Sequence, residues 1–158
     1  MLWYHFVNTI NLENKMNPTI ETQMLIRNPV QEVFEAFIDP EVTQRFWFNS
    51  STGKLEQGKT VTWSWNKYQV DTQVKVLRII ENKLIQIVWG EPRSTVDFIF
   101  EEVSPDKTYL KIRNYDIPLQ GAELIAFIID ATGGFTTVID NLKAYLEHGL
   151  TLNLIEDK

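Results

Sequence analysis

Residues 61–76 read VTWSWNKYQVDTQVKV, and this stretch decides the fold. In 61–65 and again in 70–76, every second residue is valine, tryptophan or threonine, and polar residues stand between them. A period of two predicts β-strands with one buried face and one wet face. Asn66-Lys67 is a turn signal between the two strands, so we expect an antiparallel hairpin.

The same alternation continues toward the C-terminus in three more segments, near 85–89, 96–101 and 110–113. Short turn signals separate the segments at Glu81-Asn82, at Gly90-Glu91-Pro92 and at Ser104-Pro105-Asp106. Connections this short join neighbouring strands antiparallel. The sequence therefore predicts a meander of about five strands.

Toward the N-terminus, Thr19–Arg27 alternates as a strand, and Asn28-Pro29 then reads as the start of a helix, with Asn28 as N-cap and Pro29 first in the helix. Apolar residues recur at helical spacing from Val30 to Ile38. Asp39-Pro40 breaks this helix, and Glu41–Phe48 reads as a second short one.

After Pro118–Gly121 we expect a helical segment that is broken or kinked at Gly133-Gly134, which would act as a hinge or kink beside a pocket mouth. From Phe135 to Leu146 a second apolar stripe has helical spacing, and Gly149 stands where a C-terminal cap belongs. The sheet needs a bulky element against its apolar face, and this helix is the candidate. The fold class is α+β: a curved six- to seven-stranded antiparallel sheet wrapped around a long C-terminal helix, with two short helices after the first strand.

Composition excludes several function classes. The net charge is −6, which gives no basic surface for nucleic acid or an anionic membrane. Cysteine is absent, and the two histidines, His5 and His148, lie near opposite ends. We therefore expect no metal site and no cofactor.

We expect residues 1–17 to form an N-terminal appendage and residues 18–158 to form one domain. The appendage has apolar residues at helical spacing but no signal-peptide pattern, and Met16 directly precedes the first patterned segment. No apolar run reaches the ~20 residues that span a bilayer. These observations favour a cytoplasmic protein with no membrane span.

The order and spacing of two segments resemble a known family. The strand followed by Asn28-Pro29-Val30 and Val33-Phe34-Glu35-Ala36-Phe37, then Asp39-Pro40-Glu41 and Phe46-Trp47, resembles the START-like (SRPBCC, birch-pollen-allergen-like) superfamily. The ending LKAYLEHG (142–149) is similar to the subgroup related to the activator of heat-shock-protein-90 ATPase, although Phe135 stands where that subgroup usually has tryptophan. The resemblance implies a helix-grip fold with a deep cavity for lipid-like or aromatic ligands. It implies no shared set of catalytic residues.

Inward aromatic residues on neighbouring strands are the most informative candidates for a ligand site, because apolar pockets with few polar groups are typical binding sites. The same residues are also what an ordinary core requires. Asn114 shares a face with Leu110 and Ile112 and could orient a ligand, although a backbone hydrogen bond is the more usual partner. The candidate ligand-binding residues are Trp63, Trp65, Trp89, Phe98, Phe100, Asn114, Phe135 and Ile139.

Other polar residues give weaker signals. Arg113 and Tyr115, beside Asn114, are further candidates for fixing a ligand. Glu101 and Glu102 are adjacent on a strand, so they point to opposite faces and do not form a catalytic pair. His148 suits the C-terminal end of the helix dipole.

Three functions are compatible with these features. The first is a carrier or sensor that binds a small apolar or aromatic molecule in an internal cavity. The second is a co-chaperone-like interaction module, for which the partner is a chaperone. The third is a cyclase- or hydratase-like enzyme, which requires a buried acid or base in the cavity. We expect no catalytic residues and favour the first.

Overall fold

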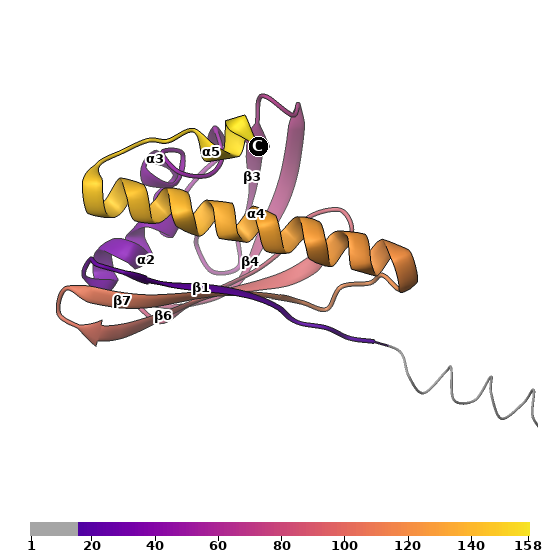
Figure 1. The fold of residues 1–158 in the computed structure, drawn as a ribbon, viewed down its shortest axis with the longest axis horizontal. Helices are drawn as coiled ribbons and strands as arrows, with labels where there is room; N and C mark the ends of the chain where they lie inside the picture. The colour runs from indigo at the N-terminus through magenta and orange to yellow at the C-terminus, as the bar shows by residue number, and fades with distance from the viewer. Residues whose placement is uncertain (1–15) are drawn as a thin grey trace, which may run out of the picture.

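The structure is a computed structural model, and it describes residues 16–158. Seven strands form one antiparallel sheet in the order β1-β7-β6-β5-β4-β3-β2. Figure 1 shows this sheet curving beneath α4, which lies across its concave face. The strands are β1 (Ile20–Ile26), β2 (Ser50–Ser51), β3 (Thr60–Trp65), β4 (Val70–Ile80), β5 (Leu84–Trp89), β6 (Ser94–Ser104) and β7 (Lys107–Tyr115).

The helices are α2 (Val30–Ile38), α3 (Pro40–Thr43), α4 (Gly121–His148) and α5 (Leu154–Asp157). The predicted α+β class, the number of strands and the long C-terminal helix are therefore confirmed. The predicted appendage lies outside the described residues, apart from Met16 and Asn17.

Apolar and polar residues alternate along the strands, so the apolar side chains gather on the face of the sheet that is turned toward the core. Across β6 and β7, Phe98 pairs with Ile112 and Phe100 with Leu110, and all four side chains are buried. On the edge, β1 buries Ile20, Thr22 and Ile26 against β7. The period-two pattern predicted this face because side chains on a pleated strand alternate.

The helix α2 begins one residue later than predicted. Pro29 occupies the cap position without a side-chain hydrogen bond, and Val30 is the first helical residue. The Asn28 side chain is used elsewhere: its Nδ2 donates to Glu32 Oε2 at 2.8 Å and to the Leu146 carbonyl at 3.3 Å. Asn28 therefore ties α2 to the end of α4 instead of capping its own helix.

The second short helix is also shorter than predicted, because α3 ends at Thr43 and not at Phe48. Phe46, Trp47 and Phe48 are consecutive, and all three are buried. Successive residues on a helix point about 100° apart, so a surface helix cannot bury three in a row. The chain leaves the helix and inserts all three rings into the core from a turn.

The predicted break in α4 at Gly133-Gly134 is wrong. The helix runs without interruption from Gly121 to His148. Gly133 and Gly134 keep a right-handed helical backbone, so nothing there depends on glycine's access to positive φ. The cap at Gly149 is confirmed: its φ is 67°, and its N–H donates to the Tyr145 carbonyl at 2.8 Å.

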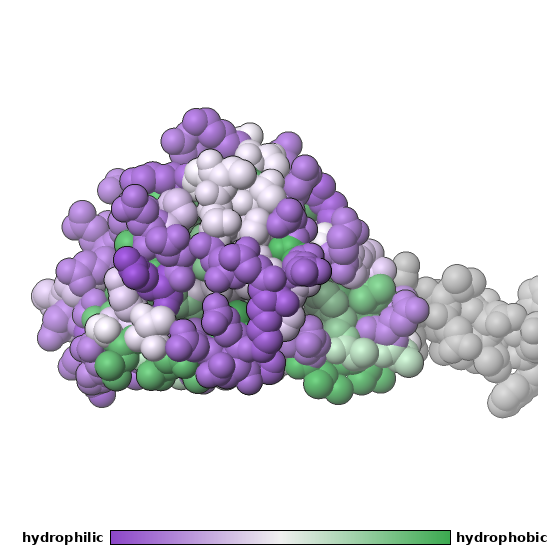
Figure 2. Space-filling model, turned by 90° about the horizontal axis from the view of Figure 1, so that it is seen from above, coloured by the Kyte–Doolittle hydropathy of each residue, from purple (hydrophilic) through white to green (hydrophobic). Residues whose placement is uncertain are grey.

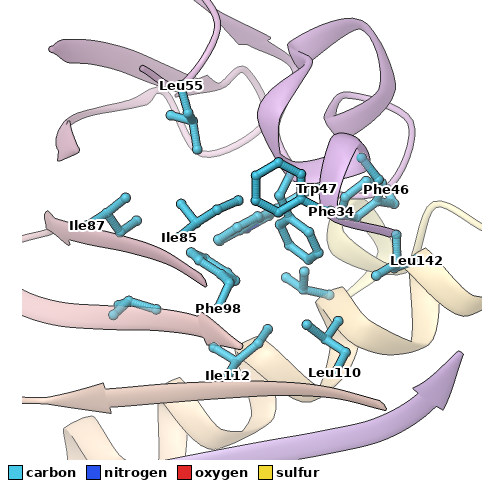
Figure 3. Close-up of a cluster of buried hydrophobic side chains, with 14 of the residues drawn as sticks. Phe34, Phe46, Trp47, Leu55, Ile85, Ile87, Phe98, Leu110, Ile112 and Leu142 are labelled. Carbon is cyan, nitrogen blue, oxygen red and sulfur yellow. The ribbon is translucent and has the colours of Figure 1, made fainter. Parts of the chain in front are cut away.

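By length and composition α4 would also suit a membrane span, and it is the one such helix within residues 16–158. In this fold it is the core helix of the domain. Phe135, Val138, Ile139 and Leu142 on one face are buried against the sheet. Figure 3 shows Phe34, Phe98 and Leu142 converging from α2, the sheet and α4.

Candidate functional site

A pocket of about 220 Å³ lies between α4 and the end of the sheet where β5 turns into β6. Three parts of the chain enclose it: the middle of α4, the Gly90–Pro92 turn, and α5. Its lining residues are Trp47, Trp89, Gly90, Glu91, Pro92, Ser94, Asn114, Phe127, Asp130, Ala131, Gly134, Phe135, Val138 and Ile155.

Four aromatic residues line the pocket, and the rings of three of them, Trp47, Trp89 and Phe135, lie close together. The ring centroids of Trp47 and Trp89 are 5.6 Å apart, and those of Trp89 and Phe135 are 6.0 Å apart. Trp47 and Phe135 are buried, while Trp89 is half-buried. Rings at these spacings present faces and edges to one space, which is the lining that suits a planar apolar molecule.

The polar side of the pocket is formed by β6 and β7. Asn114 is 1% exposed and Ser94 is 3% exposed. Asn114 Nδ2 donates to Ser94 Oγ and to the Thr95 carbonyl, each at 2.9 Å. Asn114 Oδ1 is buried and has no hydrogen-bond partner within residues 16–158.

Charge at the pocket is acidic. Glu91 and Asp130 line it and are exposed, and its lining includes no lysine or arginine. An anionic ligand would therefore meet like charge at Glu91 and Asp130 and no cation among the described lining residues.

The C-terminal segment closes one side. Ile155 of α5 lines the pocket, and the Tyr68 hydroxyl donates to the Ile155 carbonyl at 2.8 Å. Lys67, which precedes Tyr68 in the turn between β3 and β4, donates from Nζ to the carbonyl of Glu156 in α5. The turn between β3 and β4 thus holds α5 in place.

A family model described as "Activator of Hsp90 ATPase homolog 1-like protein" matches residues 27–147. The chain belongs to this family. Its membership confirms the predicted START-like superfamily and the predicted subgroup.

Solved structures agree with this membership. The chain is 33% identical to protein SSP2350 from Staphylococcus saprophyticus, over 85% of this chain and 96% of that one, with a TM-score of 0.73. The Aha1 dimer from Colwellia psychrerythraea is 18% identical, over 84% and 98%, with a TM-score of 0.72. DynU16, from the dynemicin biosynthetic locus, is 16% identical over 84% of this chain and 48% of that one, with a TM-score of 0.75. Among curated proteins, none matches.

In this family member, three of the predicted site residues line the pocket: Trp89, Asn114 and Phe135. Asn114 does make the backbone hydrogen bond that sequence reasoning expected. That any of the three binds a ligand stays a prediction.

The other five predicted residues lie beside the pocket or away from it. Trp63 and Phe98 do not line the pocket but pack on Trp47, which does, at centroid distances of 4.9 and 5.8 Å. Trp65 packs on Trp63 and Trp89, and Phe100 packs on Phe34 at the far end of the core. Ile139 faces β1, where it borders a separate hollow with Thr22 and Met24.

Arg113 and Tyr115 lie on the outer face of the sheet, so they do not face the pocket. Arg113 pairs with Glu21 at 2.9 Å. Burial, followed by the charge of nearby Asp97, raises the pKa of the Tyr115 hydroxyl. The alternation that places Asn114 inward places both of its neighbours outward.

The most informative residues that sequence reasoning missed are Trp47, Ser94 and Ile155. The Phe46-Trp47-Phe48 run is a visible signal of burial, although its position in the sequence predicts the end of a helix. Ser94 precedes the apolar alternation of β6, and Ile155 lies beyond the cap at Gly149. No local pattern marks either residue, because each reaches the pocket only through the folded chain.

Proposed function

We propose that the protein binds a small apolar or aromatic molecule in the pocket between the sheet and α4, as a carrier or sensor. The observation that supports this most directly is the ring arrangement of Trp47, Trp89 and Phe135 around an open space of about 220 Å³. An engineered cavity of about 150 Å³ holds benzene, so this space suits one or two rings. The cytoplasm as its place of action is part of the proposal.

A fluorescence titration tests the proposal, because Trp47 and Trp89 border the pocket. A bound aromatic molecule should change tryptophan emission. Affinity should rise with ligand size, since each buried methylene contributes about 0.8 kcal/mol, and should then fall when the pocket is full.

The variant Ala131→Leu should fill the pocket from α4 and weaken binding roughly tenfold or more. Ala122→Leu is the matched control, because Ala122 is exposed on the same helix and does not line the pocket. Binding that is unchanged in Ala131→Leu, or no apolar ligand that alters emission, would refute the proposal.

A second candidate is a protein-interaction module of the ATPase-activator type. The observation that favours it is an apolar face on the first half of α4, where Ile125 is 60% exposed and Ile129 is 70% exposed. Figure 2 shows apolar surface gathered at the end of the molecule where α4 begins. Exposed apolar surface of this kind marks interaction sites.

The chaperone's ATPase rate distinguishes this candidate. An interaction module should raise the rate, and Ile129→Lys should abolish the effect. A carrier should leave the rate unchanged in both forms.

A cyclase- or hydratase-like activity is the third candidate. It needs an acid or base at the reacting atoms. Glu91 and Asp130 are the carboxylates that line the pocket, and both are exposed. If the protein catalyses such a reaction through these carboxylates, Glu91→Gln or Asp130→Asn should lower its rate. A rate that is unchanged from wild type in both variants would remove this candidate.

A further inference from the structure

The first half of α4 has an apolar side that stays exposed within residues 16–158. We call its residues Ala122, Ile125 and Ile129 the α4 stripe, because spacings of three and four residues put them on one side of the helix. Little of the apolar stretch of α4 is buried, although that stretch is apolar enough to suit a membrane span. An uncharged exposed stripe of this kind marks a surface that another apolar element covers.

The α4 stripe lies on the side of the helix that is turned toward β1. Ile125 and Ile129 are followed at helical spacing by Thr132 and Thr136, so all four share one side of α4. Thr132 and Thr136 border the hollow beside β1. Since β1 is an outermost strand of the sheet, the stripe lies at this edge of the molecule.

The chain enters the same edge next to the start of α4. Gln120 directly precedes α4, and its Nε2 donates to the Met16 carbonyl at 3.1 Å. Ile20, the first residue of β1, packs in one buried cluster with Leu124. Figure 1 shows the chain entering β1 at the end of the molecule where α4 begins. Residues 1–15 are therefore attached at the foot of the α4 stripe.

The sequence of residues 1–15 has the pattern and the length to cover the stripe. Four large apolar residues recur there at the spacing of one helix face: Trp3, Phe6, Val7 and Ile10. As a helix the segment would span about 22 Å, and Ile129 lies about 14 Å along α4 from Gln120. The segment can therefore reach the whole stripe from its attachment at Met16.

We propose that residues 1–15 pack as a helix on the α4 stripe, antiparallel to α4. With Met16 level with Gln120 and the same rise along both helices, Ile10 falls level with Ala126 and Val7 level with Ile129. The two apolar sides then face each other, and an outside partner reaches this face only by displacing the segment. The pocket has no part in this contact, so ligand binding neither supports nor opposes it.

Paramagnetic relaxation in solution tests the contact, because the chain has no native cysteine. In the helical pattern of the segment, His5 lies on the side away from Phe6, Val7 and Ile10, so His5→Cys can carry a nitroxide label without blocking the apolar side. In the full chain this label should remove most of the intensity of the Ile125 and Ile129 methyl signals. Chemical reduction of the nitroxide should restore both signals.

Two substitutions in the labelled chain separate a specific contact from mere proximity. Phe6→Asp places a carboxylate on the apolar side of the segment and should restore the Ile125 and Ile129 signals. Asn8→Asp is the matched control, because it adds the same charge on the side away from the stripe, and it should leave the two signals attenuated. The remaining methyl signals of each variant report whether the domain is folded.

A mixture of two samples identifies the chain that supplies the segment. Spin-labelled chain without isotopes is added to isotope-labelled chain that keeps His5, and the Ile125 and Ile129 signals should stay at full intensity. Attenuation in this mixture would assign the stripe to a second copy of the chain, and no attenuation in any sample would leave the stripe to an outside partner. Either result would overturn the proposal, as would attenuation that survives in Phe6→Asp.

Discussion

The layer between the sheet and α4 is filled at one end and open at the other. At the closed end, α2 covers the sheet, and Phe34 and Phe37 pack on Phe98 and Phe100 with ring centroids 4.9–5.8 Å apart. At the open end Trp47, Trp89 and Phe135 have similar spacings, yet a pocket remains beside them.

The difference lies in what covers the rings and not in the rings themselves. A whole helix, α2, inserts apolar side chains at the closed end. At the open end, within residues 16–158, the Gly90–Pro92 turn, Trp47 and Ile155 of α5 line the pocket opposite α4. The same residue types therefore serve as core at one end and as a pocket lining at the other.

The largest expected effect comes from Leu142→Asp at the closed end. Leu142 has no exposed surface, so the new carboxylate would be buried without a partner. We expect a loss of about 4 kcal/mol or more of unfolding free energy, measured by urea denaturation. The control is Thr136→Asp, which adds the same charge at an exposed position of α4 and should cost little.

Two aromatic truncations compare the ends directly. Phe98→Ala should lower the free energy of unfolding, measured by urea denaturation, by about 4 kcal/mol, because the ring is fully buried and its loss leaves a cavity. Trp89→Ala should cost about half as much, since Trp89 already borders open space, but it should alter ligand affinity. Equal losses of stability would contradict the distinction between a closed and an open end.

A charged contact also holds the closed end. Glu147 Oε2 accepts from Lys143 and from the Arg27 amide, which joins α4 to the end of β1. Burial opposes ionisation of Glu147, but these hydrogen bonds outweigh it and hold the pKa below its ordinary value of 4.5.

A lowered pKa in the folded state stabilises the fold above the ordinary pKa, and this contribution is lost as the pH falls through the folded value. Glu147→Gln should therefore lower the free energy of unfolding by about 1–2 kcal/mol near neutral pH. The difference from wild type should shrink as the pH falls below the ordinary value of 4.5 and through the lowered pKa of the folded state. Denaturation curves at several pH values check this. A difference that stays constant with pH would show that charge is not the cause.

The smallest effect is expected at the open end. Gly134 has a regular helical backbone, and a β-carbon there would meet nothing within 4 Å. Gly134→Ala should therefore stabilise the protein by up to about 1 kcal/mol. Because Gly134 lines the pocket, the added methyl should also weaken the binding of larger ligands. A lower melting temperature of Gly134→Ala than of wild type would contradict this expectation and would support the hinge that the sequence predicts.

Much of the fold could be predicted from local pattern. Alternation at 61–65 and 70–76, the stripe that ends at Leu146 and the cap at Gly149 each depend on neighbours in the sequence. The errors occurred where a long-range contact overrides a local preference. Asn28 would cap α2, but the end of α4 takes its side chain.

The candidate site could be predicted only in part. Trp89, Asn114 and Phe135 lie on regular elements, so alternation and helical spacing assign their faces. Trp63 and Phe98 have the same pattern, and nothing local shows that they would pack on Trp47 and leave the pocket lining to it. Pattern predicts which face is inward but not how much space is left there.

The sequence by itself determined the elements, their order and the apolar face of each, because these follow from residue periodicity and from turn and cap chemistry within a few positions. Only the tertiary structure decided where the core ends and the pocket begins. Trp47 arrives from a turn and Ile155 from beyond the last helix cap, and both depend on contacts between residues far apart in the chain. Cavity shape is a property of packing between elements, so it becomes visible only when all of them are in place.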